Sequence, residues 1–204
     1  MSNRSCFGVL MALFVVLFAV LAVSPREPAT WAMENAVAVL FVIGLWATRR
    51  WFRFSRSAYL MMFSFLALHE IGAHYTYSHV PYDQTLHTLF GFSPDAVMGW
   101  QRNQYDRFLH LLYGLLLVLP LSELCREWGG LRRPGAALFA FSLILASSLL
   151  YELIEWGAAV MLGDGSTAFL GTQGDPWDAQ KDMALATVGA LASLVIAALA
   201  RRIR

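Results

Sequence analysis

Long apolar runs separated by short polar segments dominate the chain. Crossing the hydrocarbon layer of a membrane takes about 20 mostly apolar residues in a helix. The runs near this length cover residues 7–23, 32–48, 57–77, 104–124, 135–162 and 177–200. We therefore predict an all-α, polytopic membrane protein, a bundle of about six transmembrane helices that forms a single membrane-embedded domain over residues 1–204.

Composition supports this prediction and excludes some classes of function. Hydrophobic residues make up 58% of the chain and charged residues only 14%, against about 25% charged in soluble domains. The net charge of +1 excludes a strongly basic nucleic-acid surface, so we expect no nucleic-acid partner. The two cysteines fit neither a disulfide framework nor a zinc finger, and we expect free thiols.

The first run has two interpretations. Arg4 precedes it, and Ala22 and Ser24 close it, as in a cleavable signal peptide. Its length of about 17 residues exceeds that of a usual signal-peptide core, which favours a retained helix. Cleavage would leave the other five helices unchanged.

Arginine placement predicts the orientation, because cytoplasmic loops are enriched in Arg and Lys. One side of the predicted membrane collects eleven of the fifteen basic residues: Arg4, Arg49, Arg50, Arg53, Arg56, Arg126, Arg132, Arg133, Arg201, Arg202 and Arg204. We predict that this side is cytoplasmic, as are both termini. The two longest connections, 78–103 and 163–178, then lie outside. The first contains Ser93 followed by Pro94, a typical helix start, and the second is glycine-rich and could cover a site.

Ionisable side chains recur at helical spacing inside these apolar runs. The pairs are Glu70 with His74, Asp106 with His110, Glu152 with Glu155, and Asp178 with Asp182. Spacings of three or four residues place both members on one helix face. With the predicted orientation, all four pairs fall in the outer half of the membrane. An Asp at the centre of a membrane helix costs about 2.5 kcal/mol or more, so such groups mark functional sites.

Carboxylates and imidazoles that project inward from several helices are typical of bundle-core metal sites. We predict a divalent metal, Zn, Mn or Fe, held by oxygen and nitrogen ligands. The candidate metal ligands are Glu70, His74, Asp106, His110, Asp178 and Asp182, and the candidate catalytic residues are Glu152 and Glu155, as ligand or general base.

Each pair also has a structural interpretation. Asp178 fits the first turn of a helix capped by Asp175, and Asp182 could pair with Lys181 or Arg107. Asp106 likewise fits a first turn, His110 could simply bond Asp106, and His74 could be solvated. A structural role explains Glu152 and Glu155 least well, because no basic residue lies within their apolar run.

Four motifs, in order along the chain, carry a resemblance. They are 69-HEIGAHY-75, 103-NQYDRFLH-110, 151-YELIEW-156 and 171-GTQGDPWDAQKDM-183. Together they resemble the YjdF-like bacterial inner-membrane proteins, a family of unknown function, over about residues 32–200. The resemblance implies a multi-pass inner-membrane location and supplies no activity.

Three functions remain open. A metal-dependent hydrolase in the outer leaflet would act on an amphiphilic or lipid-linked substrate, with membrane lipids as its partners. A cation or proton transporter could use the same carboxylates and histidines, although their confinement to one half disfavours a complete path. A non-catalytic scaffold is the third, but polar contacts between membrane helices average only about 0.6 kcal/mol.

Overall fold

The computed structural model describes residues 2–162 and 172–202. Most of the predicted glycine-rich loop, 163–171, lies outside the described residues. The described part contains helices and no strand: α1 (Asn3–Leu21), α2 (Pro28–Thr48), α3 (Arg56–Tyr75), α4 (Tyr82–Phe90), α5 (Pro94–Met98), α6 (Tyr105–Glu127), α7 (Arg133–Leu162) and α8 (Asp178–Arg202). The prediction of an all-α fold is confirmed.

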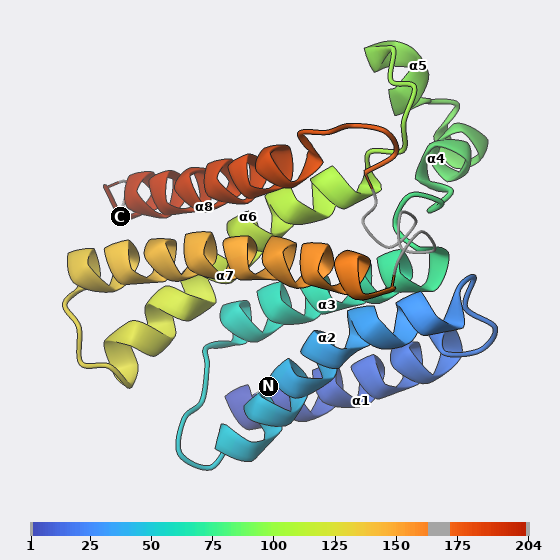
Figure 1. Cartoon of the computed structure of the whole chain (residues 1–204). Helices are drawn as coiled ribbons and strands as arrows, with labels where there is room; N and C mark the ends of the chain where they lie inside the picture. Colours follow the sequence, from blue (N-terminus) through green and yellow to red (C-terminus); the bar gives the residue numbers. More distant parts are fainter. Residues whose placement is uncertain (1, 163–171, 203–204) are drawn as a thin grey trace.

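The long helices form two groups that meet along α3 and α6. Within the first group α3 packs against α1 and α2, and within the second α6, α7 and α8 pack against one another. The short helices α4 and α5 project from one end of the bundle, and the chain begins and finishes toward the opposite end (Figure 1). The C-terminal ends of α3 and α7 and the N-terminal ends of α6 and α8 therefore lie on the same side as α4 and α5.

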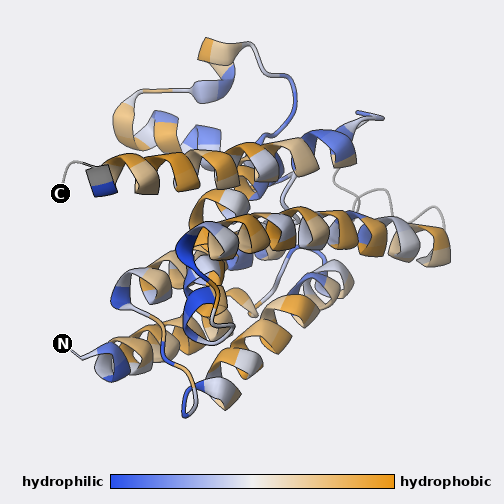
Figure 2. Cartoon of the chain, turned by 90° about the vertical axis from the view of Figure 1, so that its left-hand side faces the viewer, coloured by the Kyte–Doolittle hydropathy of each residue, from blue (hydrophilic) through white to orange (hydrophobic). Residues whose placement is uncertain are grey.

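Among the residues that the structure describes, five helices are long and apolar enough to cross a membrane: α1, α2, α6, α7 and α8. Several membrane-spanning helices are thus confirmed, and the count of about six stays a prediction. Helix α3 has 20 residues, but His69, Glu70 and His74 lower the hydropathy of its last two turns. Large apolar side chains such as Leu40, Leu149 and Ile196 lie more than 45% exposed, as expected for a surface that faces lipid. Figure 2 shows hydrophilic residues gathered mainly at helix ends and connections.

Small residues allow α6 and α8 to pack at very close range. A Cβ atom on Gly114 of α6 would collide with the backbone of Ala186 and Ala190, and one on Gly189 of α8 would collide with the backbone of α6 at Leu111 and Leu115. Such contacts between small residues drive helix association in membranes. They fix the register of α6 against α8.

The connection between α3 and α6 is more ordered than the sequence suggested. The Ser93 hydroxyl caps α5, where it accepts a hydrogen bond of 3.1 Å from the backbone N–H of Ala96, so this predicted helix start is confirmed. Helix α4 was not predicted. Asp83 of α4 accepts hydrogen bonds from the Ser93 hydroxyl and the Asp95 N–H, which ties the two short helices together. Both cysteines, Cys6 and Cys125, are free and buried.

Candidate functional site

Three helices bring acids and one imidazole together at the α4–α5 end of the bundle. Asp106 and His110 of α6 and Asp182 of α8 each offer a ligand atom, and these atoms all lie within 4.8 Å of one another. His110 Nε2 is also 3.6 Å from Asp106 Oδ1 and 3.6 Å from Oε1 of Glu152 on α7. We call Asp106, His110, Glu152 and Asp182 the acid–histidine cluster.

The cluster follows from the packing of α6 on α8. His110 lies one turn before Gly114, and Asp182 lies one turn before Ala186, so the close contact of these small residues sets the distance between the two polar side chains. Asp182 is 3% exposed and Glu152 is 9% exposed. Asp182 Oδ1 and Glu152 Oε1 are buried and have no hydrogen-bond partner among the described residues. Buried carboxylate oxygens usually have partners, and two orphans in one cluster call for a ligand or ordered water.

Two further carboxylates lie beside the cluster. Glu155, one turn after Glu152, is within electrostatic range of Glu152, Asp106 and Asp182. Glu34 of α2 is buried and accepts a hydrogen bond from the Tyr151 hydroxyl of α7. Glu34 was not predicted, because it lies near the start of an apolar run and has no ionisable partner three or four residues away, whereas Glu152 lies deep in its run and is paired with Glu155.

A turn at the end of α3 adds a tyrosine and a histidine. Thr76 and Tyr77 both adopt the left-handed backbone region, with φ of 57° and 44°, which is uncommon outside glycine and clusters at functional sites. The turn folds the Tyr77 ring onto Gly72, where a Cβ would lie 2.7 Å from a ring carbon. The Tyr77 hydroxyl is then 2.7 Å from His69 Nδ1 and lies next to the Glu34 carboxylate.

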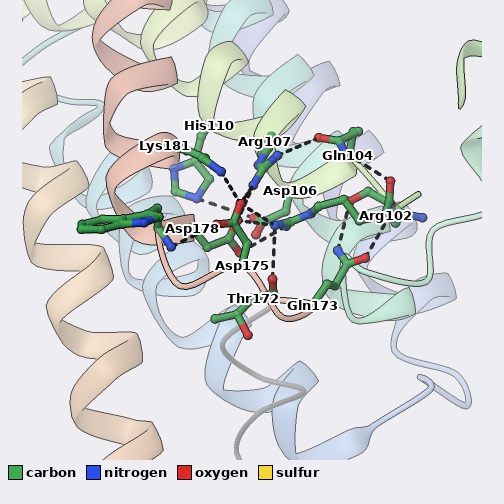
Figure 3. A network of polar contacts seen from close by, with 12 residues as sticks. Arg102, Gln104, Asp106, Arg107, His110, Thr172, Gln173, Asp175, Asp178 and Lys181 are labelled. Carbon is green, nitrogen blue, oxygen red and sulfur yellow. Dashed lines mark hydrogen bonds and ion pairs between the residues drawn. The ribbon is translucent and has the colours of Figure 1, made fainter. Parts of the chain in front are cut away.

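An ion-pair network borders the cluster toward α4 and α5 (Figure 3). Asp178 is paired with Arg102 at 2.5 Å and with Arg107 at 3.1 Å, and Arg107 also pairs with Asp175. Lys181 contacts Asp175 at 2.5 Å. Lys181 and the N–H of Trp177 hold the pKa of the Asp175 carboxyl below its usual range. The network fastens the segment before α6 to the start of α8.

The structure distributes the predicted site residues unevenly. Asp106, His110, Glu152, Glu155 and Asp182 come together. Asp178 lies beside them in the first turn of α8, as its structural interpretation anticipated, and its oxygens bind Arg102 and Arg107.

The α3 pair, Glu70 and His74, contributes no ligand atom to the group of three. His74 Nδ1 lies 2.8 Å from the carbonyl of Leu21, and the backbone carbonyl of His74 accepts from the Arg26 N–H. This histidine fastens the turn between α1 and α2. Glu70 is fully buried, and neither of its carboxyl oxygens has a hydrogen-bond partner among the described residues.

The chemistry of the site is set by its excess of acids. Glu155 lies within electrostatic range of Glu34, Asp106, Glu152 and Asp182, and His110 lies 3.6 Å from both Asp106 and Glu152. Like charges in a poorly solvated site cannot all ionise unless a cation balances them. The site is therefore suited either to a bound cation or to holding several protons.

Comparison with known proteins identifies the family. A family model described as predicted membrane protein (DUF2238) matches residues 7–203. The chain is 36% identical over 179 residues to inner membrane protein YjdF of Escherichia coli (strain K12), covering 86% of this chain and 81% of that protein. No solved structure matches. The chain belongs to the DUF2238 family and is a multi-pass protein of the inner membrane.

Proposed function

We propose that this DUF2238 protein is a metal-dependent membrane enzyme of the hydrolase type, acting on an amphiphilic or lipid-linked substrate at the outer leaflet. The observation that carries the proposal is the convergence of Asp106, His110 and Asp182 within 4.8 Å. Glu152, at 3.6 Å from His110, is the natural fourth ligand or a base. The outer location is predicted from the arginine distribution.

The residues fit a divalent metal in charge and spacing. Ligand atoms about 2.0–2.2 Å from a tetrahedral metal lie roughly 3.5 Å from one another, and His110 is 3.6 Å from both Asp106 and Glu152. Oxygen and imidazole ligands suit Zn, Mn or Fe. Two buried, unpartnered carboxylate oxygens would gain the partner they lack.

The protein groups divide into ligands and acid–base groups. A bound metal would lower the pKa of its water and polarise a carbonyl or phosphoryl oxygen. Glu155 lies at the side of the ligands and can accept a proton from water, as a general base does. Tyr151 fixes Glu34 by a hydrogen bond and so holds a second carboxylate at the edge of the same site.

Two alternative functions have weaker support. A transporter needs polar groups along the whole path. Near the opposite end of α6, the Glu123 carboxylate accepts hydrogen bonds from the N–H and hydroxyl of Ser55 at 2.5 and 2.6 Å. This acid is therefore engaged in a structural contact. A scaffold would satisfy its polar atoms by helix-to-helix bonds. The orphan oxygens of Glu152 and Asp182 argue against that role.

Metal analysis of the purified protein tests the proposal. Wild type should carry about one Zn, Mn or Fe ion per chain, and His110→Ala and Asp182→Asn should lose it, because each removes a ligand atom. Glu155→Gln should keep the metal and lose hydrolysis. His87→Ala, in exposed α4, and Glu127→Gln, more than half exposed, are matched controls that should keep the metal. Folded wild-type protein that holds no metal after incubation with each ion would overturn the proposal.

A further inference from the structure

A long cavity runs from the acid–histidine cluster through the bundle. Its volume is about 580 Å³, and it lies between α2 and α3 on one side and α6 and α7 on the other. Most of its wall is apolar, with residues such as Phe41, Leu45, Leu117 and Leu121. One end is polar, where the wall is made by His69, Tyr77, Asp106, His110 and Tyr151.

The dimensions of the cavity restrict what can occupy it. Along α6 its wall extends from Asp106 to Leu124, which is about 27 Å at a rise of 1.5 Å per residue. This length approaches the roughly 30 Å of membrane hydrocarbon. A helix of that length and about 10 Å diameter would occupy roughly 2,000 Å³. The cavity is too narrow for a helix of a partner protein and has the proportions of a single hydrocarbon chain.

The side of the cavity is open to the membrane. Helix α2 packs against α3, and no comparably extensive contact joins the described parts of α2 and α7. Val37 and Phe41 line the cavity and are nonetheless 47% and 37% exposed. At the polar end the hydrogen bond from Tyr151 to Glu34 links α7 to α2. Within a bilayer, the molecules next to such an apolar opening are lipids.

A phosphate-bearing head group fits the acidic polar end only together with a divalent cation, which would offset the acids of the cluster. The neighbouring ion-pair network holds three cationic side chains, Arg102, Arg107 and Lys181, against two acids, Asp175 and Asp178. These cations lie beside the acid–histidine cluster, where a bound divalent cation would offset the acids and give a phosphate a further positive partner. Arginine and lysine recognise phosphate by charge-assisted hydrogen bonds.

We propose that the cavity binds one hydrocarbon chain of an anionic membrane lipid, which enters between α2 and α7 and places its phosphate-bearing head at the acid–histidine cluster. The identification of this lipid as the substrate class rests on the proposed function. The binding of the chain itself depends on the apolar cavity alone.

Photolabelling with phosphatidylglycerol that carries a diazirine in the middle of one acyl chain tests the site. In wild-type protein, adducts should form on cavity residues such as Leu117 and Leu121, besides a background on lipid-facing residues such as Leu149. Gly44 lines the cavity and has no atom within 4 Å of an added Cβ. Gly44→Phe should therefore fold and should lower the cavity adducts at least about fivefold by filling the space.

Gly8→Phe is the matched control. Gly8 is an exposed glycine of α1 with equally open surroundings and no part in the cavity wall, so this variant should label like wild type. Val37→Trp, a second filling variant at the half-exposed rim, replaces Gly44→Phe if circular dichroism shows that the latter is unfolded. Labelling confined to lipid-facing residues, or unchanged in folded filling variants, would overturn the proposal.

Metal content measured on the same preparations separates the two proposals. Cavity adducts in a protein that binds no metal would refute the metal-dependent enzyme and leave the lipid site standing. A stoichiometric metal without cavity adducts would refute the lipid site and leave the metal site standing.

Discussion

Replacing Gly114 by alanine tests how α6 and α8 hold the acid–histidine cluster together. The added Cβ would lie 2.7 Å from the backbone N of Ala190 and closer still to the carbonyl oxygen of Ala186, whereas real Cβ atoms essentially never approach within 3.0 Å. Both obstacles are backbone atoms, so no side-chain rotation relieves the clash. The two helices must move apart.

The size of this movement follows from the contact distance. Restoring an ordinary contact of 3.4–4 Å to Ala190 N alone requires a shift of 0.7–1.3 Å, the difference from 2.7 Å, and the closer Ala186 oxygen requires a larger one. Overpacking costs about 1–3 kcal/mol, and a clash with two backbone groups belongs at the upper end of that range. Subtracting the gain of up to about 1 kcal/mol from placing alanine in a helix leaves a loss of about 2–3 kcal/mol. The unfolding temperature should fall by roughly 4–12 °C. A similar displacement of Asp182 from His110 exceeds the tolerance of about 0.2 Å in metal–ligand distances.

Thermal unfolding followed by circular dichroism, together with metal content, measures both effects. Gly8→Ala is the control, because a Cβ there meets nothing within 4 Å and should leave stability equal or slightly higher. Gly114→Ala should lose both stability and metal. A variant that unfolds at the wild-type temperature and retains its metal would refute the inferred role of the α6–α8 contact.

Three further changes test the surroundings of the cluster. Tyr151→Phe removes a hydrogen-bond donor from the buried Glu34 carboxyl, and the free energy of unfolding should fall by about 1–3 kcal/mol. Arg102→Gln removes one of the two cationic partners of Asp178, which is 3% exposed and keeps Arg107, and should cost about 1.5–3 kcal/mol. Asp175 has a pKa below its ordinary 3.8, so the stability advantage of wild type over Asp175→Asn should be complete above that value and decline as the pH falls through the lower folded-state pKa.

Denaturation of the purified variants in detergent decides these three predictions. Tyr151→Phe with unchanged stability would mean that Glu34 does not depend on this hydroxyl. For Arg102→Gln, the comparison is Arg126→Gln, whose ion pair with Glu127 is exposed and should matter little. For Asp175, an advantage over Asp175→Asn that stays constant down to pH 2 would contradict the lowered pKa.

The sequence predicted the helices well because membrane spans are set by the lengths of apolar runs. The predicted run 104–124 corresponds to Tyr105–Glu127, and 135–162 corresponds to Arg133–Leu162. Helix α4 escaped prediction because its nine residues are amphipathic and lie between turns rather than within an apolar run. The orientation of the helices in the membrane, with both termini cytoplasmic, is inferred from the arginines and stays a prediction.

The site was predicted in part because helical spacing reports which residues share a face but not what that face meets. Asp106 and His110 share a face that α8 covers, so both join the cluster. Glu70 and His74 have the same spacing, yet the turn between α1 and α2 binds His74 through the Leu21 carbonyl. The partners of Asp178 could not be foreseen, because Arg102 lies 76 residues away in the chain.

The most direct test of the metal centre is the X-ray absorption spectrum of purified protein loaded with zinc. The spectrum should fit one imidazole nitrogen and otherwise oxygen ligands at about 2.0–2.2 Å, and the imidazole contribution should disappear in His110→Ala while it persists in His87→Ala. Zinc that keeps the same coordination shell in His110→Ala, or that binds with sulfur ligands, would contradict a metal held by Asp106, His110 and Asp182.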